Sequence, residues 1–546
     1  MRLSLSRLRS RRSYFPLLVL YGVFCLCAFY ALKSRKRVDL NLKSDLNNDG
    51  TGTYEPNAIR VVTSEETQGG SPVDPDVKLK RNTIREMMKH AWSSYAKHAW
   101  GSNELSVDSK SGHQAAFFGT VPMGITIIDS LDTLFIMELN EEFESARRYV
   151  KDTLNFRKYT KVSLFEFNIR VLGGLLSAYS LTMDEIFLQK AVELADRLLP
   201  AFKTSTGIPM SLVNLLTGDR INYNWMSGGC SSLADVGTLH MEFTYLSELT
   251  GNAVYARKVH RIREVIRQIH QPSELFFNAI SPNEPRWCDE SAGLASLADS
   301  FYEYLLKEWI RTNHRDTVAR VMYDEGIQAL LTHDVFRYSK RGHLYLCPFR
   351  SVNCKMEHLA CFAGGMLALG AANISDPWFD RGKNVTETCR LSYASSRTHL
   401  GPESFTYSVA SETVPVARHN LLRPETVESY FYLWRLTKDS KYRDWAWDLA
   451  VALENYSRTP DGYAGLRNVD VPGQLDGVQQ AYFLAETLKY LYLIFSEDTL
   501  LPLNRWVFNT EAHPFPVRDR VILKHGYVWP KPFKTSQDPE NLSSKN

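Results

Sequence analysis

Residues 233–258, LADVGTLHMEFTYLSELTGNAVYARK, carry the pattern that decides the fold. An acidic residue, Asp235, opens a helix pattern rich in aromatic and aliphatic residues. A short turn at Gly251 follows, and then a more polar helix pattern begins. Acidic residues open similar apolar patterns at four further positions, which are Glu166, Asp299, Glu425 and Glu486. The apolar patterns after Glu166 and Glu425 end in residues 178–191 and 432–445, which are similar in sequence to residues 245–258 after Asp235.

Such helix pairs are the unit of a helical toroid, because each pair buries its apolar face only against its neighbours. If the inner helices run in the same direction, their acidic starts gather at one end of the ring. The sequence therefore predicts an all-α fold with a pocket lined by carboxylates, which suits sugar hydrolysis. The alternative for each single residue is a plain helix cap, since an acidic residue at a helix start satisfies free N–H groups and suits the helix dipole.

The composition defines a broad class. The chain has 546 residues, of which 44% are hydrophobic and 23% charged, as in ordinary globular proteins. Its net charge of +3 indicates neither a nucleic-acid partner nor an acidic one, and much of the basic excess lies at the N-terminus. The many aromatic residues (27 Tyr, 27 Phe and 11 Trp) are typical of a thick helical core.

An uncharged stretch, residues 14–32, lies between two clusters of basic residues near the N-terminus. As a helix it would be about 28 Å long, close to the thickness of the bilayer hydrocarbon. We interpret it as a signal-anchor transmembrane helix behind a cytosolic tail, residues 1–13. A cleaved signal peptide is the alternative, but the apolar run is long and no clear cleavage site follows it.

Four N-glycosylation sequons follow this stretch, and they support a type II orientation with a lumenal body, because glycans are added on the lumenal side. They begin at Asn373, Asn384, Asn455 and Asn541. Residues 33–80 are polar and lack a sustained apolar period, which indicates a stem. The helical pattern begins at Arg81 and continues to about Phe495. We expect one catalytic domain over residues 81–520 and a C-terminal tail over residues 521–546.

The body from Arg85 to Pro514 closely resembles the class I α-1,2-mannosidases, glycoside hydrolase family 47. The matching runs are SLDTLFIM (130–137), FNIRVLGGLLSAY (167–179), LADRLLPAF (194–202), DSFYEYLLK (299–307), HLACFAGGMLALG (358–370), HNLLRPETVES (419–429), FLAETLKYLYL (483–493) and VFNTEAHPFP (507–516). The resemblance implies an (α/α)7 barrel. It also implies Ca²⁺-dependent removal, with inversion, of terminal α-1,2-linked mannose from high-mannose N-glycans.

An inverting glycosidase needs one carboxylic acid to protonate the leaving oxygen and one carboxylate to activate water. The resemblance implies Glu166 as the general acid, Glu425 as the general base and Asp299 as a third catalytic carboxylate. Arg170 stands four residues after Glu166 on the same helix face. A positive partner stabilises the ionised form of a carboxylate, whereas a general acid must carry a proton, so other groups must oppose this arginine. The alternative for this pair is an ordinary surface ion pair.

Further residues are expected to bind substrate: Arg170, Asp235, Leu297, Arg423, Glu428 and Glu486. Asp235 stands where the family more often has glutamate. With Glu511, seven acidic residues would share the cavity with two arginines, which calls for a cation, and oxygen ligands suit Ca²⁺. The resemblance implies Thr510 as its ligand, through the hydroxyl and the carbonyl oxygen; a simple cap in a turn is the alternative. His513 is expected to pack or to form hydrogen bonds rather than to bind metal.

Eight cysteines are present. Cys25 and Cys27 lie in the expected membrane span. The resemblance implies a disulfide between Cys361 and Cys389, and a lumenal compartment permits it. The pairing of Cys230, Cys288, Cys347 and Cys354 stays open.

The resemblance also implies that the residue two positions before Asp299 influences specificity. In the family, arginine there accompanies the endoplasmic-reticulum type and leucine the Golgi type; this chain has Leu297. The preceding residues, WCDESAGLASLADS (287–300), differ from the approach usual in Golgi relatives. We therefore expect a Golgi membrane enzyme that trims nine-mannose glycans toward five mannoses. The alternatives are an endoplasmic-reticulum type that removes one mannose, a glycan-binding relative with weak hydrolysis, and a toroid of different chemistry.

Overall fold

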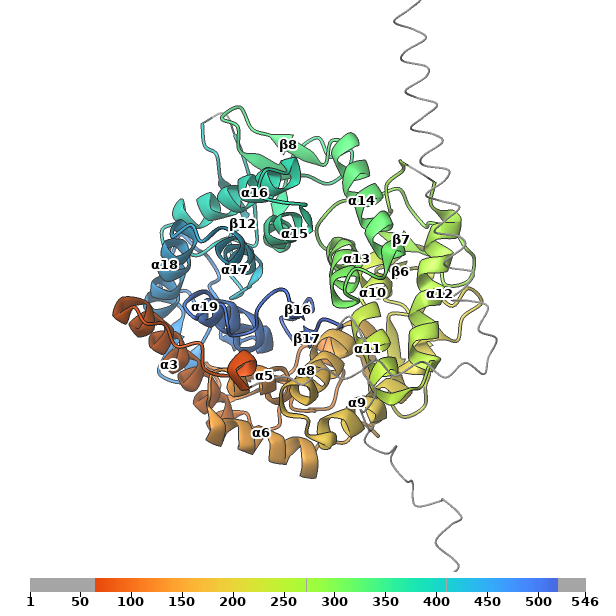
Figure 1. Cartoon of the computed structure of the whole chain (residues 1–546), viewed down its shortest axis with the longest axis horizontal. Coiled ribbons are helices and arrows are strands. Elements are labelled where there is room, and N and C mark those ends of the chain that lie inside the picture. The colour runs from red at the N-terminus through yellow and green to blue at the C-terminus, as the bar shows by residue number, and fades with distance from the viewer. Residues whose placement is uncertain (1–63, 272, 409, 519–546) are drawn as a thin grey trace, which may run out of the picture. The chain divides into compact units, whose positions relative to one another are not determined.

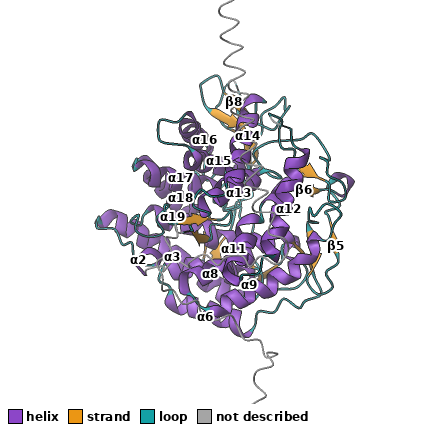
Figure 2. Cartoon of the chain, turned by 45° about the vertical axis from the view of Figure 1, so that its right-hand side comes forward, coloured by secondary structure: helices purple, strands orange, loops and turns teal. Residues whose placement is uncertain are grey.

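The computed structural model describes residues 64–271, 273–408 and 410–518, all of which belong to the unit Glu55–Asn546. Helices are the main regular structure of the described residues, and the strands are short (Figure 2). The expected tail, anchor and most of the stem lie outside the described residues, as does Asn541. Among the described residues, no helix has the length and apolar character needed to cross a membrane.

The long helices alternate between an inner and an outer circle (Figure 1). Each inner helix packs against the outer helix that follows it in the sequence. These pairs are α5 (Leu131–Ile136) with α6 (Asn140–Asp152), α8 (Gly173–Thr182) with α9 (Glu185–Leu198), α11 (His240–Thr250) with α12 (Val254–Ile269), α13 (Asp299–Arg311) with α14 (Thr317–Thr332), α15 (Ala363–Gly370) with α16 (Pro377–Ala394), and α17 (Glu425–Thr437) with α18 (Lys441–Tyr456). The repeat that the sequence indicated is therefore present.

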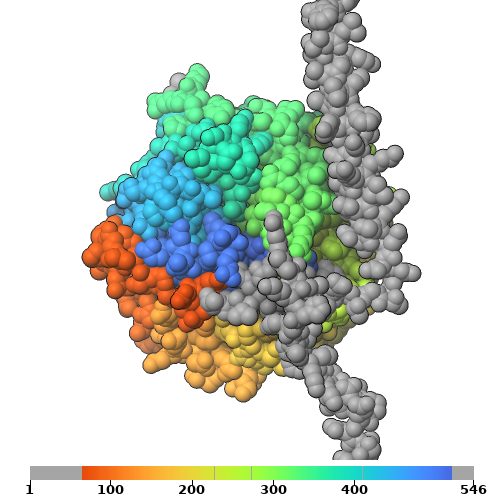
Figure 3. All heavy atoms as spheres, viewed as in Figure 1, coloured from red at the N-terminus to blue at the C-terminus, as the bar shows by residue number. Residues whose placement is uncertain are grey.

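The ring closes between the two ends of the described chain. Helix α19 (Leu488–Ile494) packs against α17 on one side and against α3 (Pro75–His98) on the other. In Figure 3 the red N-terminal atoms accordingly lie next to the blue C-terminal ones. Because α19 joins the first helix to the last pair, no inner helix leaves its apolar face uncovered at this junction.

Helix α3 begins at Pro75, before the expected start of the pattern at Arg81. Asp74 is its N-cap, and its side chain accepts hydrogen bonds from the backbone N–H groups of Asp76 and Val77. Proline suits the first helical position, where no N–H donor is needed. The polar face of the first turn hid this start from an analysis of apolar periodicity.

The turns between paired helices use ordinary capping residues. Gly251 ends α11 in the left-handed conformation, with φ +69°, which glycine adopts without strain. Asp184 caps α9 by accepting a hydrogen bond from the N–H of Ile186. Short turns of this kind keep each inner helix antiparallel to its outer partner, so all inner helices run in the same direction.

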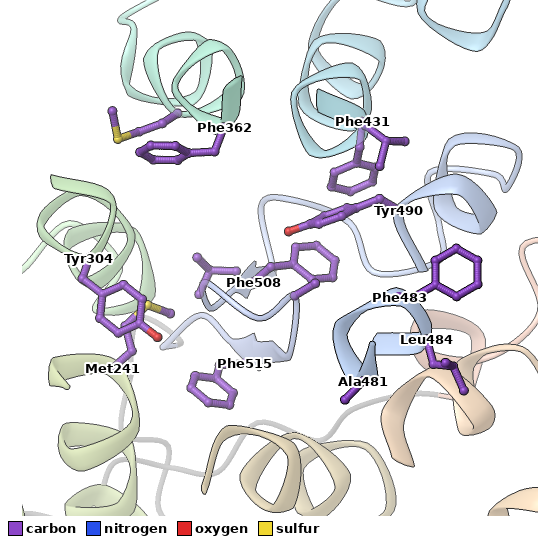
Figure 4. Close-up of a cluster of buried hydrophobic side chains, with 14 of the residues drawn as sticks. Met241, Tyr304, Phe362, Phe431, Ala481, Phe483, Leu484, Tyr490, Phe508 and Phe515 are labelled. Carbon is purple, nitrogen blue, oxygen red and sulfur yellow. The ribbon is translucent and has the colours of Figure 1, made fainter. Parts of the chain in front are cut away.

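A hairpin of β16 (Trp506–Phe508) and β17 (Pro514–Pro516) lies in the middle of the ring (Figure 1). Phe508 and Phe515 of this hairpin point into the buried apolar cluster drawn in Figure 4, where Phe431 and Tyr490 approach Phe508 from α17 and α19. The inner helices thus pack around a solid core, and the turn of the hairpin, residues 509–513, is held at the centre.

The remaining elements are short. The small sheets are β15–β1–β2, β3–β4–β5, β6–β7, β8–β9, β10–β11–β12 and β13–β14. Their strands are β1 (Glu104–Ser106), β2 (Ser111–His113), β3 (Lys161–Ser163), β4 (Leu212–Asn214), β5 (Arg220–Ile221), β6 (Ser231–Ser232), β7 (Ala279–Ile280), β8 (Phe336–Tyr338), β9 (Leu344–Leu346), β10 (Met356–Glu357), β11 (Ser404–Thr406), β12 (Val414–Ala417), β13 (Arg458–Thr459), β14 (Gly462–Tyr463) and β15 (Val478–Gln479). Short helical segments are α2 (Ser64–Thr67), α4 (Ile125–Asp129), α7 (Leu164–Glu166), α10 (Leu233–Gly237), η1 (Ala116–Phe118), η3 (Leu199–Phe202) and η5 (His358–Phe362).

Two π-helical segments, η2 (Phe167–Leu172) and η6 (Phe483–Thr487), open the inner helices α8 and α19. π-helical turns are rare and are found frequently at functional sites. Glu166 directly precedes the first segment, and Glu486 lies within the second. Two of the expected pocket residues therefore lie in or directly before a π-helical turn.

Candidate active site

The five acidic residues at the inner helix starts line one pocket of about 1050 Å³. These residues are Glu166, Asp235, Asp299, Glu425 and Glu486. The same pocket is lined by Arg170, Leu297, Arg423, Glu428, Thr510 and Glu511, so the structure brings all the expected pocket residues together. Parallel inner helices explain this convergence, because their starts meet at one end of the ring.

Arg170 connects Glu166 to the floor of the pocket. Its Nε donates to Glu166 Oε2 at 2.7 Å, and its Nη1 contacts the carboxylate of Glu511 and, at 3.5 Å, Asp129 Oδ2. The Arg170 side chain is 9% exposed. The pair with Glu166 is therefore not an ordinary surface ion pair, and one guanidinium is shared among three carboxylates.

Glu425 is held by a histidine that the sequence analysis did not identify. His358 Nδ1 lies 2.6 Å from Glu425 Oε2, and His358 Nε2 lies 2.6 Å from the hydroxyl oxygen of Tyr393. Burial opposes ionisation of Glu425, but the hydrogen bond and the charge of His358 outweigh it and lower the pKa of Glu425. Glu425 is therefore suited to accept a proton.

Asp299 has the opposite electrostatic environment. Burial, together with the nearby charges of Glu303 and Glu425, raises the pKa of Asp299 to about 7, although the N–H of Ser300 donates to it at 2.8 Å. Burial also raises the pKa of Asp235 to about 6. Carboxyls whose pKa values are pushed apart within one cavity are typical of acid–base sites.

A buried lysine compensates part of the negative charge. Lys307 is 1% exposed and makes ion pairs with Glu303 and, at 3.4 Å, with Glu428. Burial and the neighbouring charges of Glu303 and Glu425 still raise the pKa of Glu428 to about 8. The sequence contained a signal for this set, because Asp299, Glu303 and Lys307 follow at four-residue spacing on one helix face.

The turn that bears Thr510 is fixed by Asn509. Asn509 Nδ2 donates to the carbonyl oxygen of Ile169 at 3.0 Å and to Glu242 Oε1 at 2.8 Å. Its Oδ1 accepts hydrogen bonds from the backbone N–H groups of Glu511 and His513 at 2.9 and 2.8 Å. The side chain of Asn509 therefore fixes the turn that places Thr510 at the pocket wall.

His513 is fully buried, and its two ring nitrogens contact Asp132 Oδ2 at 2.7 Å and Asp129 Oδ1 at 3.2 Å. The prediction that it forms hydrogen bonds is confirmed. Burial lowers the pKa of His513, but Asp132 and Asp129 outweigh this effect and raise it. His513 thus anchors the hairpin turn against α4 and α5.

The donor atoms around Thr510 fit a hard cation. The pocket wall offers oxygen atoms from Thr510 and from several carboxylates, and burial and mutual repulsion raise the pKa of Glu486 well above its ordinary value. Among the residues that the structure describes, no group of three or more His, Cys, Asp or Glu side chains is arranged to hold an ion directly. Hydroxyl, carbonyl and carboxylate oxygens are the ligand atoms that Ca²⁺ prefers.

Leu297 lies at the pocket wall with φ +95°, a conformation that is strained for a residue with a side chain. Its carbonyl oxygen accepts a hydrogen bond of 2.7 Å from the N–H of Ala234. This bond connects the residues before Asp299 with those before Asp235. The neighbouring helix starts are thereby fixed relative to each other.

Three disulfides are present among the described residues. Cys361 and Cys389 are bonded, as predicted. The four cysteines whose pairing the sequence left open form the bridges Cys230–Cys288 and Cys347–Cys354. The sequon residues Asn373 and Asn455 are exposed and Asn384 is half-buried in α16; none of the three lines the pocket.

Comparison with known proteins identifies the family. The model of glycosyl hydrolase family 47 matches residues 87–517. The chain belongs to this family. Among its relatives in glycosyl hydrolase family 47, the mannosyl-oligosaccharide 1,2-alpha-mannosidase IA of Sus scrofa is 49% identical over 463 residues, which cover 83% of this chain and 70% of the relative. The mannosyl-oligosaccharide 1,2-alpha-mannosidase IB of Homo sapiens is 48% identical over 461 residues, covering 82% and 72%.

A solved structure agrees with this family assignment. The α-1,2-mannosidase from Trichoderma reesei superposes with a TM-score of 0.74 at 28% identity, and the match covers 81% of this chain and 99% of that chain. The pocket described above thus belongs to a fold that is shared with a solved α-1,2-mannosidase.

Proposed function

We propose that this protein hydrolyses terminal α-1,2-linked mannose on high-mannose N-glycans, with inversion at the anomeric carbon. The observation that carries the proposal is the convergence of Glu166, Asp299 and Glu425 on one pocket in a chain of glycosyl hydrolase family 47. The names of the family relatives support the substrate class. The alternating inner and outer helices support the assignment as an (α/α)7 barrel, here residues 81–520.

Glu425 is the general base in this proposal. His358 favours its ionised form, so Glu425 can take a proton from the attacking water. Glu166 is the general acid and protonates the leaving glycosidic oxygen, directly or through a water. Asp299 is the third carboxylate, and its pKa of about 7 lets it hold a proton near neutral pH.

The remaining pocket residues bind and orient the sugar. Arg170 fixes the carboxylate of Glu166, while Arg423 donates to Glu403 Oε1 at 2.5 Å and stacks over the ring of Tyr482. Asp235, Glu428 and Glu486 supply acceptors for sugar hydroxyls, and Leu297 leaves space for alternative branches. Hydroxyl groups of a bound mannose would thus replace water on carboxylates that are otherwise poorly compensated.

Ca²⁺ is the proposed cofactor, held through Thr510. When bound, it would supply positive charge against the carboxylates and a point of attachment for sugar hydroxyls. Asn509 and His513 hold the turn that presents Thr510, and Lys307 contacts the carbonyl oxygen of Asn509 at 3.5 Å.

We further propose that the protein is a single-pass type II protein of the Golgi membrane. The anchor over residues 14–32, the stem over residues 33–80 and the sequons support this, and Leu297 supports the Golgi type over the endoplasmic-reticulum type. The exposed positions of Asn373 and Asn455 are compatible with glycosylation.

Digestion of a nine-mannose oligosaccharide by the full chain, with and without EDTA, tests the proposal. We expect calcium-dependent trimming to five mannoses. If trimming stops at eight mannoses, the protein is instead an enzyme of the endoplasmic-reticulum type. Binding of the oligosaccharide without mannose release would favour a glycan-binding protein, and in that case Glu425→Gln would leave the function intact.

A further inference from the structure

Two loops form one side of the pocket mouth. Residues 222–230 connect β5 to β6, and residues 281–298 connect β7 to α13. The first loop contributes Tyr223 and Trp225 to the pocket wall, and the second contributes Ser296 and Leu297. The first loop leads through β6 into α10, whose third residue is Asp235, and the second leads directly into α13, which starts at Asp299.

A disulfide joins these loops. Cys230 at the end of the first loop is bonded to Cys288 in the second, 58 residues later. The backbones next to the bridge also pair, because β6 and β7 form a two-residue ladder and the N–H of Cys288 donates to the carbonyl oxygen of Ala279 at 2.9 Å. The bridge therefore reinforces a very short stretch of sheet.

The apolar packing under the aromatic wall is centred on this bridge. Cys230, Met226 and Ala279 form a small buried cluster that is separate from the main core, and Tyr223 and Cys288 pack against it. Gly228 and Gly229, both with positive φ, precede Cys230 and are exposed. The disulfide is therefore the covalent anchor of this loop, beside a hydrogen bond of 2.7 Å from Asn222 Nδ2 to the carbonyl oxygen of Gly229.

The wall itself presents an aromatic face. The rings of Tyr223 and Trp225 stack with centroids 5.2 Å apart and an interplanar angle of 22°. Trp225 is 62% exposed, although it lines the pocket. An exposed aromatic ring beside a polar pocket is suited to pack against the apolar face of a pyranose ring.

We propose that the Cys230–Cys288 disulfide is a specificity element that holds the Tyr223–Trp225 wall against a mannose residue distant from the bond being cleaved. The inference rests on the proposed function. The carboxylates act on the terminal mannose, whereas the aromatic wall binds a further part of the branched oligosaccharide. The bridge fixes the distance between this wall and Leu297, and so determines which branch enters. Cys230 and Cys288 are positioning residues in this arrangement.

The test compares two substrates, an α-1,2-linked mannose disaccharide and the nine-mannose oligosaccharide. We expect Cys230→Ser/Cys288→Ser to hydrolyse the disaccharide with kcat and KM within about twofold of the parent. For the oligosaccharide, KM should rise about three- to tenfold, the range that one aromatic contact supplies. The order in which the product isomers appear should also change, which a purely structural bridge would not cause.

Trp225→Ala in the disulfide-bonded protein should raise KM for the oligosaccharide by a similar factor. When it is combined with the cysteine substitutions, the effects should not add, because both changes disable the same wall. Trp100→Ala is the matched control, since Trp100 is 41% exposed and does not line the pocket. It should leave KM and the product order unchanged.

Three results would overturn the inference: equal losses on both substrates, unchanged oligosaccharide kinetics in the cysteine variant, or additive effects with Trp225→Ala. If the cysteine variant does not fold, an unchanged KM in Trp225→Ala would overturn it as well. Failure of the parent protein to release mannose from either substrate would instead contradict the proposed function.

Discussion

The two ends of helix α13 carry buried charges in different ways. At its last residue, Arg311 is fully buried and donates to Glu248 through both Nη atoms at 2.8 and 2.9 Å and to Glu308 Oε2 at 2.7 Å. Arg518 also pairs with Glu248 at 2.5 Å. Burial opposes ionisation of Glu248, but Arg311 outweighs it and lowers the pKa of Glu248. Two arginines and two glutamates thus form one buried network, in which burial still raises the pKa of Glu308 despite Arg311.

At the first residue of the same helix, the compensation is incomplete. Asp299 faces Glu303 and Glu425, has no ion pair with a cationic side chain of the described residues, and its pKa rises to about 7. Lys307 serves both Glu303 and Glu428. The difference indicates that removing one partner of a paired buried charge would cost stability, whereas the unpaired buried carboxylates gather in the pocket of the proposed substrate and cation.

The largest effect is expected for Glu425→Gln, in the pocket beside the first residue of α13. Loss of the general base should lower kcat for disaccharide hydrolysis by about 10³-fold, because glutamine accepts no proton. The midpoint of thermal unfolding should change little, since the amide oxygen can still accept a hydrogen bond from His358. Mannose release measured beside thermal unfolding checks both statements, and a fully active variant would remove Glu425 from the mechanism.

For Arg311→Met, at the last residue of α13, we expect a loss of stability rather than a loss of activity. It leaves Glu248 and Glu308 buried without their main partner and should lower the free energy of unfolding by about 3–5 kcal/mol. Activity per folded molecule should stay near that of the parent. Arg458→Gln is the matched control, because its pair with Glu454 is partly exposed and contributes about 0.5 kcal/mol at most. Equal losses of unfolding free energy in the two variants, measured by denaturant unfolding, would contradict the distinction between buried and partly exposed ion pairs.

An effect that vanishes at low pH is expected for Asp299→Asn. The folded-state pKa of Asp299, about 7, lies above its ordinary value, so its contribution to stability is fully present below about pH 4 and is lost as the pH rises through 7. Asparagine does not ionise and avoids this loss. Relative to the parent, the variant should gain unfolding free energy as the pH rises from 4 to 8, by at most about 4 kcal/mol, since each pKa unit corresponds to about 1.4 kcal/mol. If the curves of unfolding free energy against pH run parallel for the two proteins, the pKa of Asp299 is not raised in the folded protein.

The sequence predicted the features that depend on local periodicity. The acidic residues before apolar runs identified the inner helix starts, and their common direction in paired helices explains why Glu166, Asp299 and Glu425 meet. The disulfide Cys361–Cys389 and the position of Thr510 followed from the family resemblance rather than from physical reasoning.

Contacts between residues distant in the sequence could not be predicted. His358 reaches Glu425 from 67 residues away, and it lies where other inner helices begin with an acidic residue. The role of Asn509 depends on Ile169, 340 residues before it. The π-helical segment after Glu166 has no periodic signature that distinguishes it from an α-helix.

Thermal unfolding of the full chain in Ca²⁺ and in EDTA tests the central claim most directly, namely that the pocket carries negative charge that a cation must offset. The account predicts a midpoint that rises with Ca²⁺ concentration, because a ligand that binds only the folded state stabilises it. The rise should be smaller in Thr510→Val, which loses the hydroxyl ligand. The same midpoint in Ca²⁺ and in EDTA for the parent protein would contradict the claim.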